Sequence, residues 1–536
     1  MQETPAPLNG KNGNGVNPWV IAPLVALAAF MEVLDISIAN VSLLHIAGSL
    51  SVSQDEATWV LTSYTVTNGI VIPLSGWLSS TLGRKRYFLI CILGFSFTSL
   101  MCGLAPSIGV LVAFRALQGI MGGGLQPASQ AILADAFPPS RRSMAFALYG
   151  MSVVFAPAIG PTLGGWITDH FSWRWVFLIN VPIGLLLYPL INALVKDPRH
   201  LVEARKARKA AAPKTDYIGF GLLALGLGSL QIVLDRGQQD DWWSSPHIVV
   251  LAIAAAAGLL MFVIWEWHDR DPIVDVHMFR DKNFAVSNLL MFIFGFILLG
   301  STAILPLYVQ SLMGYTATDA GMVLTPGGFT VMLLMPLVAR LLTKVPTRLL
   351  IAWGFMVTAS SLLYMTQFSL QTDFETILWA RVLQASGFAF LFIPVNTAAF
   401  ETVGPDKSSS ASAMINMARN IGGSVGISLS ATLLARREQF HQSRLHEVFT
   451  SFNDAYHQQV DTINRAILHL SQSLSLPGQS TAANGILYQE MVRQANMLAY
   501  LDIFRIMALL FVLLIPVIFL LRKGTPSMDD TGFHHA

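Results

Sequence analysis

Two carboxylates lie inside a stretch of sequence that is otherwise typical of a membrane-spanning helix. Glu32 and Asp35 belong to FMEVLDISIAN, residues 30–40, and Arg115 lies in another apolar stretch. A charge that faces lipid near the bilayer centre costs at least about 2.5–3.5 kcal/mol, so each must face a partner or a watery cavity. Counting a rise of ~1.5 Å per residue places Asp35 and Arg115 at similar depth. We therefore expect Asp35 to pair with Arg115.

Glu32 lies almost on the same helix face as Asp35, because positions i and i+3 are neighbours. One guanidinium cannot fully neutralise two acids, so at least one carboxylate is expected to exchange protons with a cavity. This predicts proton coupling through Asp35, Glu32 and Arg115. The alternative is a permanent Asp35–Arg115 bridge, with Glu32 as a hydrogen-bonded neighbour.

The composition is that of a membrane protein. Of the 536 residues, 53% are hydrophobic and 12% are charged, whereas soluble domains carry roughly 25% charged residues. Apolar runs recur from residue 19 to residue 521, and about fourteen of them approach the ~20 residues that a membrane-crossing helix needs. The strand alternation of a membrane barrel is not visible. We expect an all-α membrane protein with about fourteen transmembrane helices.

Positive residues in the short loops predict the orientation. Lys and Arg gather in loops that fall on one side, as in GRKR at residues 83–86, and this side is expected to be cytoplasmic together with both termini. We therefore divide the chain into a cytoplasmic tail 1–18, a six-helix half 19–195, a basic linker with two inserted helices 196–283, a six-helix half 284–521 that includes a periplasmic loop 435–497, and a cytoplasmic tail 522–536.

An internal repeat supports this division. FRALQG around Arg115 recurs as ARVLQA around Arg381, and the offset 381 − 115 = 266 also relates Gln118 to Gln384 and Gly160 to Gly426. The offset crosses an even number of spans, so both copies have the same orientation. Parallel halves of this kind are a transporter architecture, with the substrate path between them. Arg381 has no obvious acid in its half and is either a relic of the repeat or a second coupling residue.

Glycine and proline are dense in GMSVVFAPAIGPTLGG, residues 150–165. They allow close packing of helix backbones and bend the helix, so this helix is either a tight packing element or a seal between rocking halves. The turn GWLSSTLGRKR either anchors to anionic lipid or controls a gate. The expected structural and gating residues are Gly76, Gly83, Arg84, Gly119, Gly150, Pro157, Gly160, Pro161, Gly164 and Arg381.

Other classes of protein lack the residues they need. A net charge of +2 and dispersed basic residues argue against nucleic-acid binding. The two cysteines, Cys91 and Cys102, share one apolar run and suggest neither a disulfide framework nor a metal site. No phosphate-binding GxxxxGK[ST] loop occurs, and no nucleophile with its base was found in the spans, so we expect neither an ATPase nor a membrane enzyme.

Together these segments resemble the major facilitator superfamily, and within it the fourteen-helix drug:proton antiporters of the EmrB/QacA type, over nearly the whole chain. The resemblance rests on LDISIANV at 34–41, LVAFRALQGIMGGG at 111–124, the span-five motif at 150–165, and WRWVFLINVPIG at 173–184. Two positions depart from the pattern. Ser80 stands where the loop motif has an acid, and Leu44 stands where a proline often ends the first-span motif.

The resemblance implies proton-driven efflux of amphipathic drugs across the cell inner membrane, with the proton gradient in place of a cofactor. It also implies a periplasmic adaptor and an outer-membrane channel as partners. Candidate substrate contacts between the halves are Trp59, Tyr64, Gln126, Tyr308 and Asn396, for which ordinary helix packing is the alternative. The loop 435–497 is expected to form amphipathic helices outside the membrane, as a solvated cap or as an adaptor-docking surface. The other functions left open are a lipid or siderophore exporter and a non-transporting sensor.

Overall fold

The structure, a computed structural model, describes residues 17–197, 202–203, 205, 216–269, 272–404, 407–448, 458, 461–463, 465 and 480–521. The terminal tails 1–16 and 522–536, most of the basic linker 196–214 and the middle of the loop 435–497 lie outside the described residues. Within the described residues every regular element is a helix. The expected all-α fold is confirmed.

The first half comprises helices α1 to α9. Their bounds are α1 Pro18–Val41, α2 Leu43–Leu50, α3 Gln54–Leu82, α4 Arg84–Gly103, α5 Ile108–Gly122, α6 Leu125–Ala136, α7 Pro139–His170, α8 Trp175–Leu178 and α9 Asn180–Leu194. Glycines interrupt the helices of this half at two places. Gly83 joins α3 to α4 with φ +93°, a conformation that favours glycine, and the segment from Gly122 to Gly124 divides α5 from α6.

The inserted helix pair and the second half comprise helices α11 to α19. Their bounds are α11 Tyr217–Arg236, η1 Trp242–Ser244, α12 Pro246–His268, η2 Val276–Arg280, α13 Lys282–Ser311, α14 Ala317–Leu341, α15 Thr347–Met365, α16 Phe374–Glu401, α17 Ser408–Val448 and α19 Ser480–Ile518.

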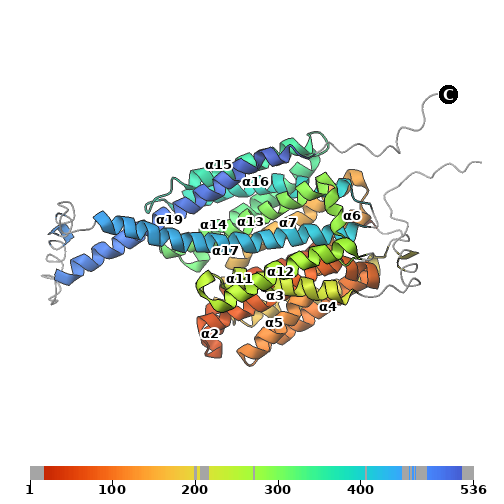
Figure 1. Cartoon of the computed structure of the whole chain (residues 1–536), viewed down its shortest axis with the longest axis horizontal. Helices are drawn as coiled ribbons and strands as arrows, with labels where there is room; N and C mark the ends of the chain where they lie inside the picture. The colour runs from red at the N-terminus through yellow and green to blue at the C-terminus, as the bar shows by residue number, and fades with distance from the viewer. Residues whose placement is uncertain are drawn as a thin grey trace, which may run out of the picture.

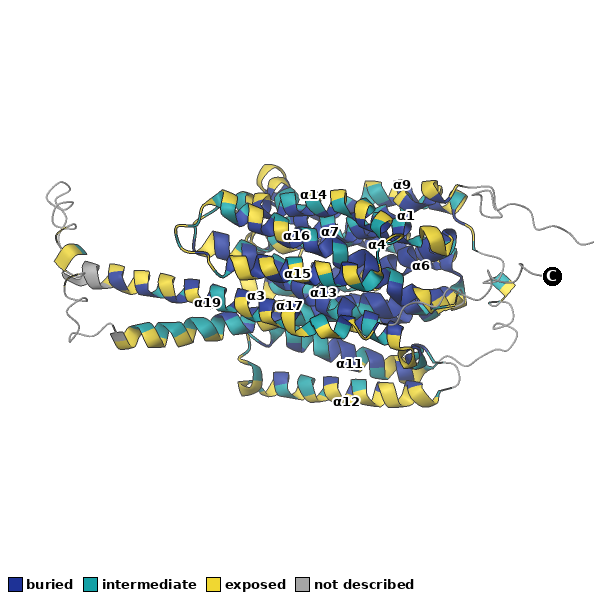
Figure 2. Ribbon diagram, turned by 90° about the horizontal axis from the view of Figure 1, so that it is seen from above, coloured by how far each residue is buried: buried dark blue, intermediate teal, exposed yellow. Residues whose placement is uncertain are grey.

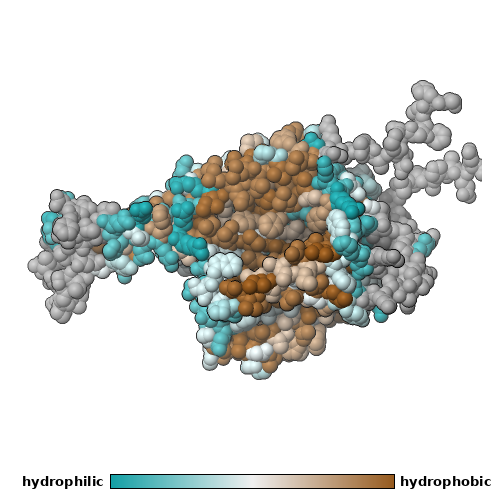
Figure 3. All heavy atoms as spheres, in the orientation of Figure 1, coloured by the Kyte–Doolittle hydropathy of each residue, from teal (hydrophilic) through white to brown (hydrophobic). Residues whose placement is uncertain are grey.

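Twelve spans of the described chain are long and apolar enough to cross a membrane. Two further long helices, α3 and α17, lie among them (Figure 1) and contact α5 and α13, respectively. Their polar residues, such as Asn68 and Arg419, are buried inside the bundle. Twelve candidate spans and these two helices match the expected number of fourteen. In the view of Figure 3, hydrophobic side chains cover the middle of the bundle, and hydrophilic ones gather toward its two ends.

The two halves meet mainly along two pairs of helices, with smaller contacts of α6 with α17 and of α16 with α7. Helix α7 packs against α14, and α3 packs against α17. The inserted helices α11 and α12 pack on each other at one side of the bundle (Figure 2), and α12 exposes most of its surface. The inserted helices therefore lie beside the contact between the halves, which is formed largely by α7, α14, α3 and α17.

The ends of the bundle differ. We call the end with the turn at Gly83, where α1 begins and α19 finishes, the basic end. At the opposite end α17 and α19 project beyond the other helices (Figure 1), and we call this the arm end. Helix α17 continues to Val448 although its apolar run finishes near residue 434, and α19 begins at Ser480 instead of 498. Helices are thus present in the segment 435–497, but they are continuous with the spans.

Candidate functional site

Asp35 and Arg115 form a buried ion pair inside the first half. The Asp35 Oδ2 atom lies 2.6 Å from Nη1 of Arg115, and neither side chain is exposed. Asp35 belongs to α1 and Arg115 to α5, so the pair joins the first and fourth spans. The pairing that was expected from their similar depth is present in the structure.

Amide and hydroxyl groups complete the surroundings of this ion pair. Gln118 Nε2 and Asn180 Nδ2 both donate to Asp35 Oδ1, at 3.1 Å and 2.7 Å. Arg115 donates from Nη1 to Gln118 Oε1 at 2.7 Å and from Nε to the Val60 carbonyl at 3.0 Å. The Asp35 charge is thus balanced within the first half by a cation and by several fixed donors.

Glu32 has a different environment, although it lies one turn away on α1. Its Oε1 atom accepts hydrogen bonds from the Tyr64 hydroxyl at 3.2 Å and from Asn68 Nδ2 at 3.1 Å, and its Oε2 atom accepts one from Gln126 Nε2. The side chain is completely buried. No Lys, Arg or His nitrogen of the described chain lies within ion-pair distance of it. Its direct partners are therefore all neutral.

Glu32 nevertheless connects the two halves through one amide. Gln126 belongs to α6, and its Oε1 atom accepts a hydrogen bond from Nη2 of Arg419 in α17. The chain Glu32–Gln126–Arg419 thus joins an acid of the first half to a cation of the second half. A change of charge on Glu32 would be felt at the contact between the halves, since the groups are buried and poorly screened.

A second set of neutral polar groups joins the halves one turn further along α6. Gln130 Oε1 accepts from Asn416 Nδ2 at 2.6 Å and from Ser412 Oγ at 2.9 Å, and its Nε2 atom donates to Asn396 Oδ1. The Tyr149 hydroxyl donates to Asn416 Oδ1 at 3.0 Å. Amide and hydroxyl groups of this kind can exchange partners as two surfaces separate, because they carry no charge to desolvate.

The candidate substrate residues do not all lie at this contact. Tyr64, Gln126 and Asn396 belong to the two hydrogen-bonded groups described above. Trp59 is 39% exposed, and the Arg236 guanidinium of α11 lies 5.0 Å from its ring. Tyr308 is buried within the second half, where its hydroxyl donates to the Ser369 carbonyl at 3.3 Å. Trp59 and Tyr308 therefore do not share a site with the other three.

Several predicted gating glycines lie where helices approach closely. A Cβ at Gly76 of α3 would lie 2.9 Å from the Cα of Ser410 in α17. Gly150 of α7 faces Phe392 of the second half, and its Cβ would lie 2.6 Å from that ring. The remaining close approaches are within the first half: Gly119 lies against Tyr64, Gly160 against Ser37, and Gly164 against Ile38.

The prolines of α7 lie inside that helix. The Pro157 carbonyl, whose potential helix donor would be the nitrogen of Pro161, accepts a hydrogen bond from Ser37 Oγ at 3.4 Å. A proline nitrogen has no hydrogen to donate, so α1 supplies this contact from its side. The Gly/Pro-rich stretch thus packs α7 against α1 on one face and against α14 on another.

At the basic end an ion pair of the first half is hydrogen-bonded to the second half, although Ser80 stands where the loop motif has an acid. Arg84 Nη1 binds Asp135 of α6, and Arg84 Nη2 donates to Ser408 Oγ of α17 at 3.1 Å. Ser408 Oγ in turn lies 3.0 Å from Asp135 Oδ1. Asp135 was not among the residues singled out from the sequence, and its only signal is an acid near the end of an apolar run. We call this group of Arg84, Asp135 and Ser408 the latch; its acid is Asp135.

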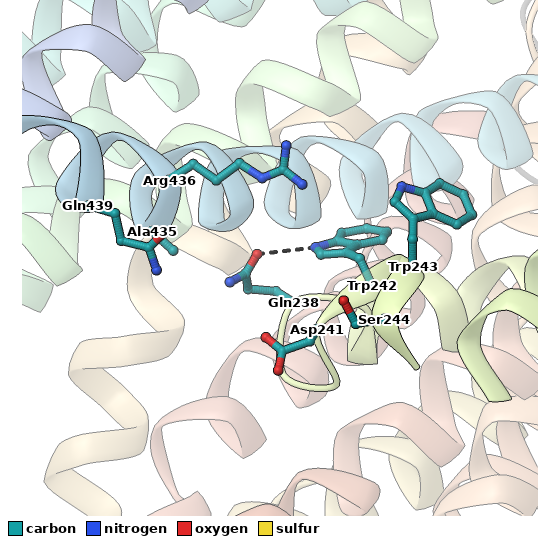
Figure 4. Close-up of a pocket in the computed structure, with 8 residues that line it drawn as sticks. All are labelled: Gln238, Asp241, Trp242, Trp243, Ser244, Ala435, Arg436 and Gln439. Carbon is teal, nitrogen blue, oxygen red and sulfur yellow. Dashed lines mark hydrogen bonds between the residues drawn. The ribbon is translucent and has the colours of Figure 1, made fainter. Parts of the chain in front are cut away.

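A surface pocket lies apart from these buried groups, at the base of the arms. It occupies about 230 Å³ between the α11–α12 connection and α17, and Trp242 Nε1 donates to Gln238 Oε1 at 3.1 Å in its wall (Figure 4). Trp243 and Arg436 also line it. Because it is open at the arm end and does not include any of the buried polar groups, it is separate from the contact between the halves.

Known proteins resemble this chain over nearly its full length. The profile of the Major Facilitator Superfamily matches residues 25–427. The fatty acid resistance protein FarB of Neisseria gonorrhoeae is 36% identical over 519 residues, which are 96% of this chain and 98% of FarB. The multidrug export protein EmrB of Escherichia coli is 34% identical over 522 residues, 97% and 98% of the two chains.

Solved structures share the fold at low sequence identity. A double-tryptophan mutant of XylE has a TM-score of 0.60 at 14% identity and covers 95% of this chain and 97% of its own. The human organic anion transporter MFSD10 has a TM-score of 0.55 at 15% identity and covers 92% and 99%. These structures establish the similarity of fold only.

Proposed function

The chain belongs to the major facilitator superfamily, and from this premise we propose that it exports amphipathic compounds in exchange for protons by alternating access. The family consists of transporters and not of enzymes, which agrees with the absence of catalytic groups from our reading of the sequence. The relatives named for multidrug export and fatty acid resistance support export as the direction. The observation that carries proton coupling is the position of Glu32, a buried acid that has no ion-pair partner among the described residues.

Glu32 is the acid that we assign to proton uptake. An ionised carboxylate inside a membrane protein is costly without a cation, and a proton removes that cost. Protonated Glu32 becomes a hydrogen-bond donor and would compete with Arg419 for the Oε1 atom of Gln126. Protonation would thus release the link between the halves, whereas a deprotonated Glu32 would restore it.

Asp35 and Arg115 have a supporting part in this scheme. Their ion pair supplies a fixed charge pair next to Glu32, and Asp35 takes up a proton only when Arg115 moves away. We propose that both acids contribute to coupling, and we assign the exchanged proton to Glu32 because its hydrogen-bond partners are neutral. The competing interpretation remains a permanent structural Asp35–Arg115 bridge.

The substrate path follows the contact between the halves, to which α6 and α16 contribute beside α7, α14, α3 and α17. Tyr64, Gln126 and Asn396 supply polar contacts there, and Phe155 and Phe329, whose rings lie 5.1 Å apart across the halves, supply apolar ones. Such a mixture of amide and aromatic groups suits amphipathic compounds of varied shape. In cells the pump would lie in the inner membrane with both termini in the cytoplasm.

The projecting parts of α17 and α19 are proposed as the docking surface for a periplasmic adaptor, which would connect the pump to an outer-membrane channel. At their base Asp502 of α19 accepts from His441 Nε2 of α17 at 2.7 Å, and Arg437 Nε, also of α17, lies 3.7 Å from its Oδ2 atom. These contacts hold the two arms together. A solvated cap without a partner is the alternative.

A lipid-like substrate is the second candidate within transport. It is favoured by the 36% identity to a protein named for fatty acid resistance. A siderophore exporter and a non-transporting sensor have no comparable support. Fatty acids are amphipathic, so this candidate concerns the headgroup of the substrate and keeps the same path.

Efflux from proteoliposomes tests the proposal. We expect a cationic dye to leave the vesicles only when a pH gradient is imposed, and we expect Glu32→Gln and Asp35→Asn to abolish this gradient-driven flux. Glu375→Gln, an exposed acid of α16, is the matched control. Gradient-driven efflux that survives in both acid variants would exclude these acids from the coupling.

A further inference from the structure

The second half contains a copy of the Asp35–Arg115 site in which the acid is missing. The repeat offset relates Arg115 to Arg381, Gln118 to Gln384 and Asp35 to Ser301, since 381 − 115 = 384 − 118 = 301 − 35 = 266. The hydrogen bonds of the two arginines correspond in the same way. Arg115 Nη1 binds Asp35 and Gln118, and Arg381 Nη1 donates to Ser301 Oγ at 3.1 Å and to Gln384 Oε1.

Within the described residues, Arg381 is therefore a buried cation without a counter-charge. Its side chain is 3% exposed, and no carboxylate among the described residues lies within ion-pair distance of it. Its partners are neutral: Ser301, Gln384 and Thr302, to whose Oγ1 atom Nη2 donates at 2.8 Å. Burying a guanidinium with hydroxyl and amide oxygens alone is unfavourable compared with burying it beside an anion.

Unused hydrogen-bond donors surround the place of the missing acid. Arg381 Nε and Gln384 Nε2 are buried and have no hydrogen-bond partner in the described part of the chain. In the first half the corresponding Gln118 Nε2 donates to the Asp35 carboxylate and to Ser99. The hydroxyl of Thr358, on the neighbouring α15, is also buried and unpartnered. The copy thus keeps the donors of the first-half site and lacks the acceptor that they bind there.

We propose that Arg381 and Gln384 bind a monovalent anion, either the carboxylate of an amphipathic substrate or a small ion such as chloride. A guanidinium offers a planar set of N–H donors that matches a carboxylate, and the free Gln384 amide adds a further donor. The proposal extends the proposed function to anionic substrates but does not depend on proton coupling, because binding at equilibrium needs no gradient.

Helix α14 lies between this site and the contact between the halves. At this level its residues are glycines, so no side chain of α14 stands between them. A Cβ at Gly327 would lie 3.3 Å from Arg381 Cγ, and a Cβ at the next residue, Gly328, would lie 2.7 Å from the Cβ of Ala158 in α7. Pro326 precedes them and removes a helix hydrogen bond. Proline and glycine are typical of helix kinks, so a bend of α14 here would connect Arg381 with the substrate path.

Equilibrium binding to the full-length protein in nanodiscs tests this assignment, with decanoate and decyltrimethylammonium as probes that differ in headgroup charge. We expect Arg381→Gln to weaken decanoate binding about tenfold or more, the usual effect of losing a charged hydrogen-bond partner, and to change decyltrimethylammonium binding less than twofold. Ser301→Asp restores the acid of the first half and is expected to weaken decanoate binding equally. Arg340→Gln, an exposed arginine of α14, is the control.

A second measurement separates the two sources of the anion. If chloride is the ligand, exchange of chloride for gluconate lowers the Tm of the wild type and of Arg340→Gln, but not of the two site variants. If Arg381→Gln does not fold, the decanoate binding and the chloride dependence of the Tm are compared between Ser301→Asp and the wild type alone. Site variants that match the wild type in both measurements overturn the proposal. Loss of gradient-driven dye efflux from the wild type would instead overturn the proposed function and leave the binding result unaffected.

Discussion

Glu32 and Asp35 lie one helical turn apart on α1, but only Asp35 has a direct ionic partner. Arg115 binds Asp35 inside the first half, whereas Glu32 reaches Arg419 of the second half only through Gln126. Two acids on nearly the same helix face thus differ in what their protonation would disturb. Protonation of Asp35 would disturb the packing of one half, and protonation of Glu32 would disturb the contact between the halves.

Asp35→Asn should destabilise the protein strongly. It leaves the completely buried Arg115 guanidinium without its counter-charge, which costs about 3–5 kcal/mol when a buried pair is broken from one side. We expect a clear fall in the Tm of the purified protein. Asp55→Asn, an exposed position in the first turn of α3, is the control, and equal Tm values for the two variants would contradict the structural role of the pair.

Glu32→Gln should abolish proton release on substrate binding while leaving the fold intact. The amide has the shape of the acid but cannot lose a proton near neutral pH. With a pH-sensitive dye in weakly buffered detergent solution, the wild type is expected to release protons when a cationic substrate is added, and Glu32→Gln is expected to release none. Undiminished release from the variant would assign the proton to another group.

Gly76→Ala should shift the protein toward a conformation that is open at the basic end. The added methyl group would meet the backbone of Ser410, and overpacking of this kind costs about 1–3 kcal/mol, roughly 5- to 150-fold in the equilibrium. Spin labels at Thr81 and Lys407 would report a longer distance between α3 and the start of α17. Gly69→Ala, with open space around it in the same helix, should leave the distance unchanged. A distance unchanged in both variants would show that this approach does not close the basic end.

Asp135→Asn should loosen the same end by a different route. It removes the charge that holds Arg84, which also donates to Ser408 of the second half. The expected result is a broader distribution of distances between the labels at Thr81 and Lys407. Asp169→Asn, an exposed acid at the arm end of α7, serves as the comparison. Identical distributions for both variants would mean that the Arg84–Asp135 pair does not hold the halves together.

Removal of the arms should separate transport from resistance. Replacing residues 437–496 by a short glycine-serine linker keeps the spans of α17 and α19 and deletes most of the projecting parts. We expect gradient-driven dye efflux from proteoliposomes within about twofold of the wild type, and loss of resistance in cells that contain the adaptor. Loss of efflux from proteoliposomes would instead give the arms a part in transport itself.

The fold was predictable because its signals are long and repeated. Apolar runs near 20 residues determine the spans, and the offset that relates Arg115 to Arg381 determines the parallel halves. The same reasoning placed Asp35 and Arg115 at one depth, which led to the correct pair. It also missed part of the extent of α17, because residues after Leu434 are polar and a hydropathy pattern cannot distinguish a projecting helix from a loop.

The details of the site were less accessible, since depth in the membrane does not determine which way a helix face points. Trp59 and Tyr308 were suitable side chains, but their helices turn them toward Arg236 and Ser369. Gln130 and Asn416 were not singled out, because a neutral amide in an apolar run is a weaker signal than a charge. Asp135 was not predicted either, because an acid near the end of an apolar run is common where a helix leaves the membrane.

The unbroken course of α17 gives the molecule a lever. One helix of 41 residues, about 60 Å long, carries Ser408 at the latch, Arg419 beside Glu32's partner and Val448 at the tip of an arm. A small tilt of α17 at the level of Glu32 would therefore displace Val448 by a larger distance. A protein bound to the arms, if the proposed docking surface is correct, would be displaced by that tilt without contacting Glu32 or the contact between the halves.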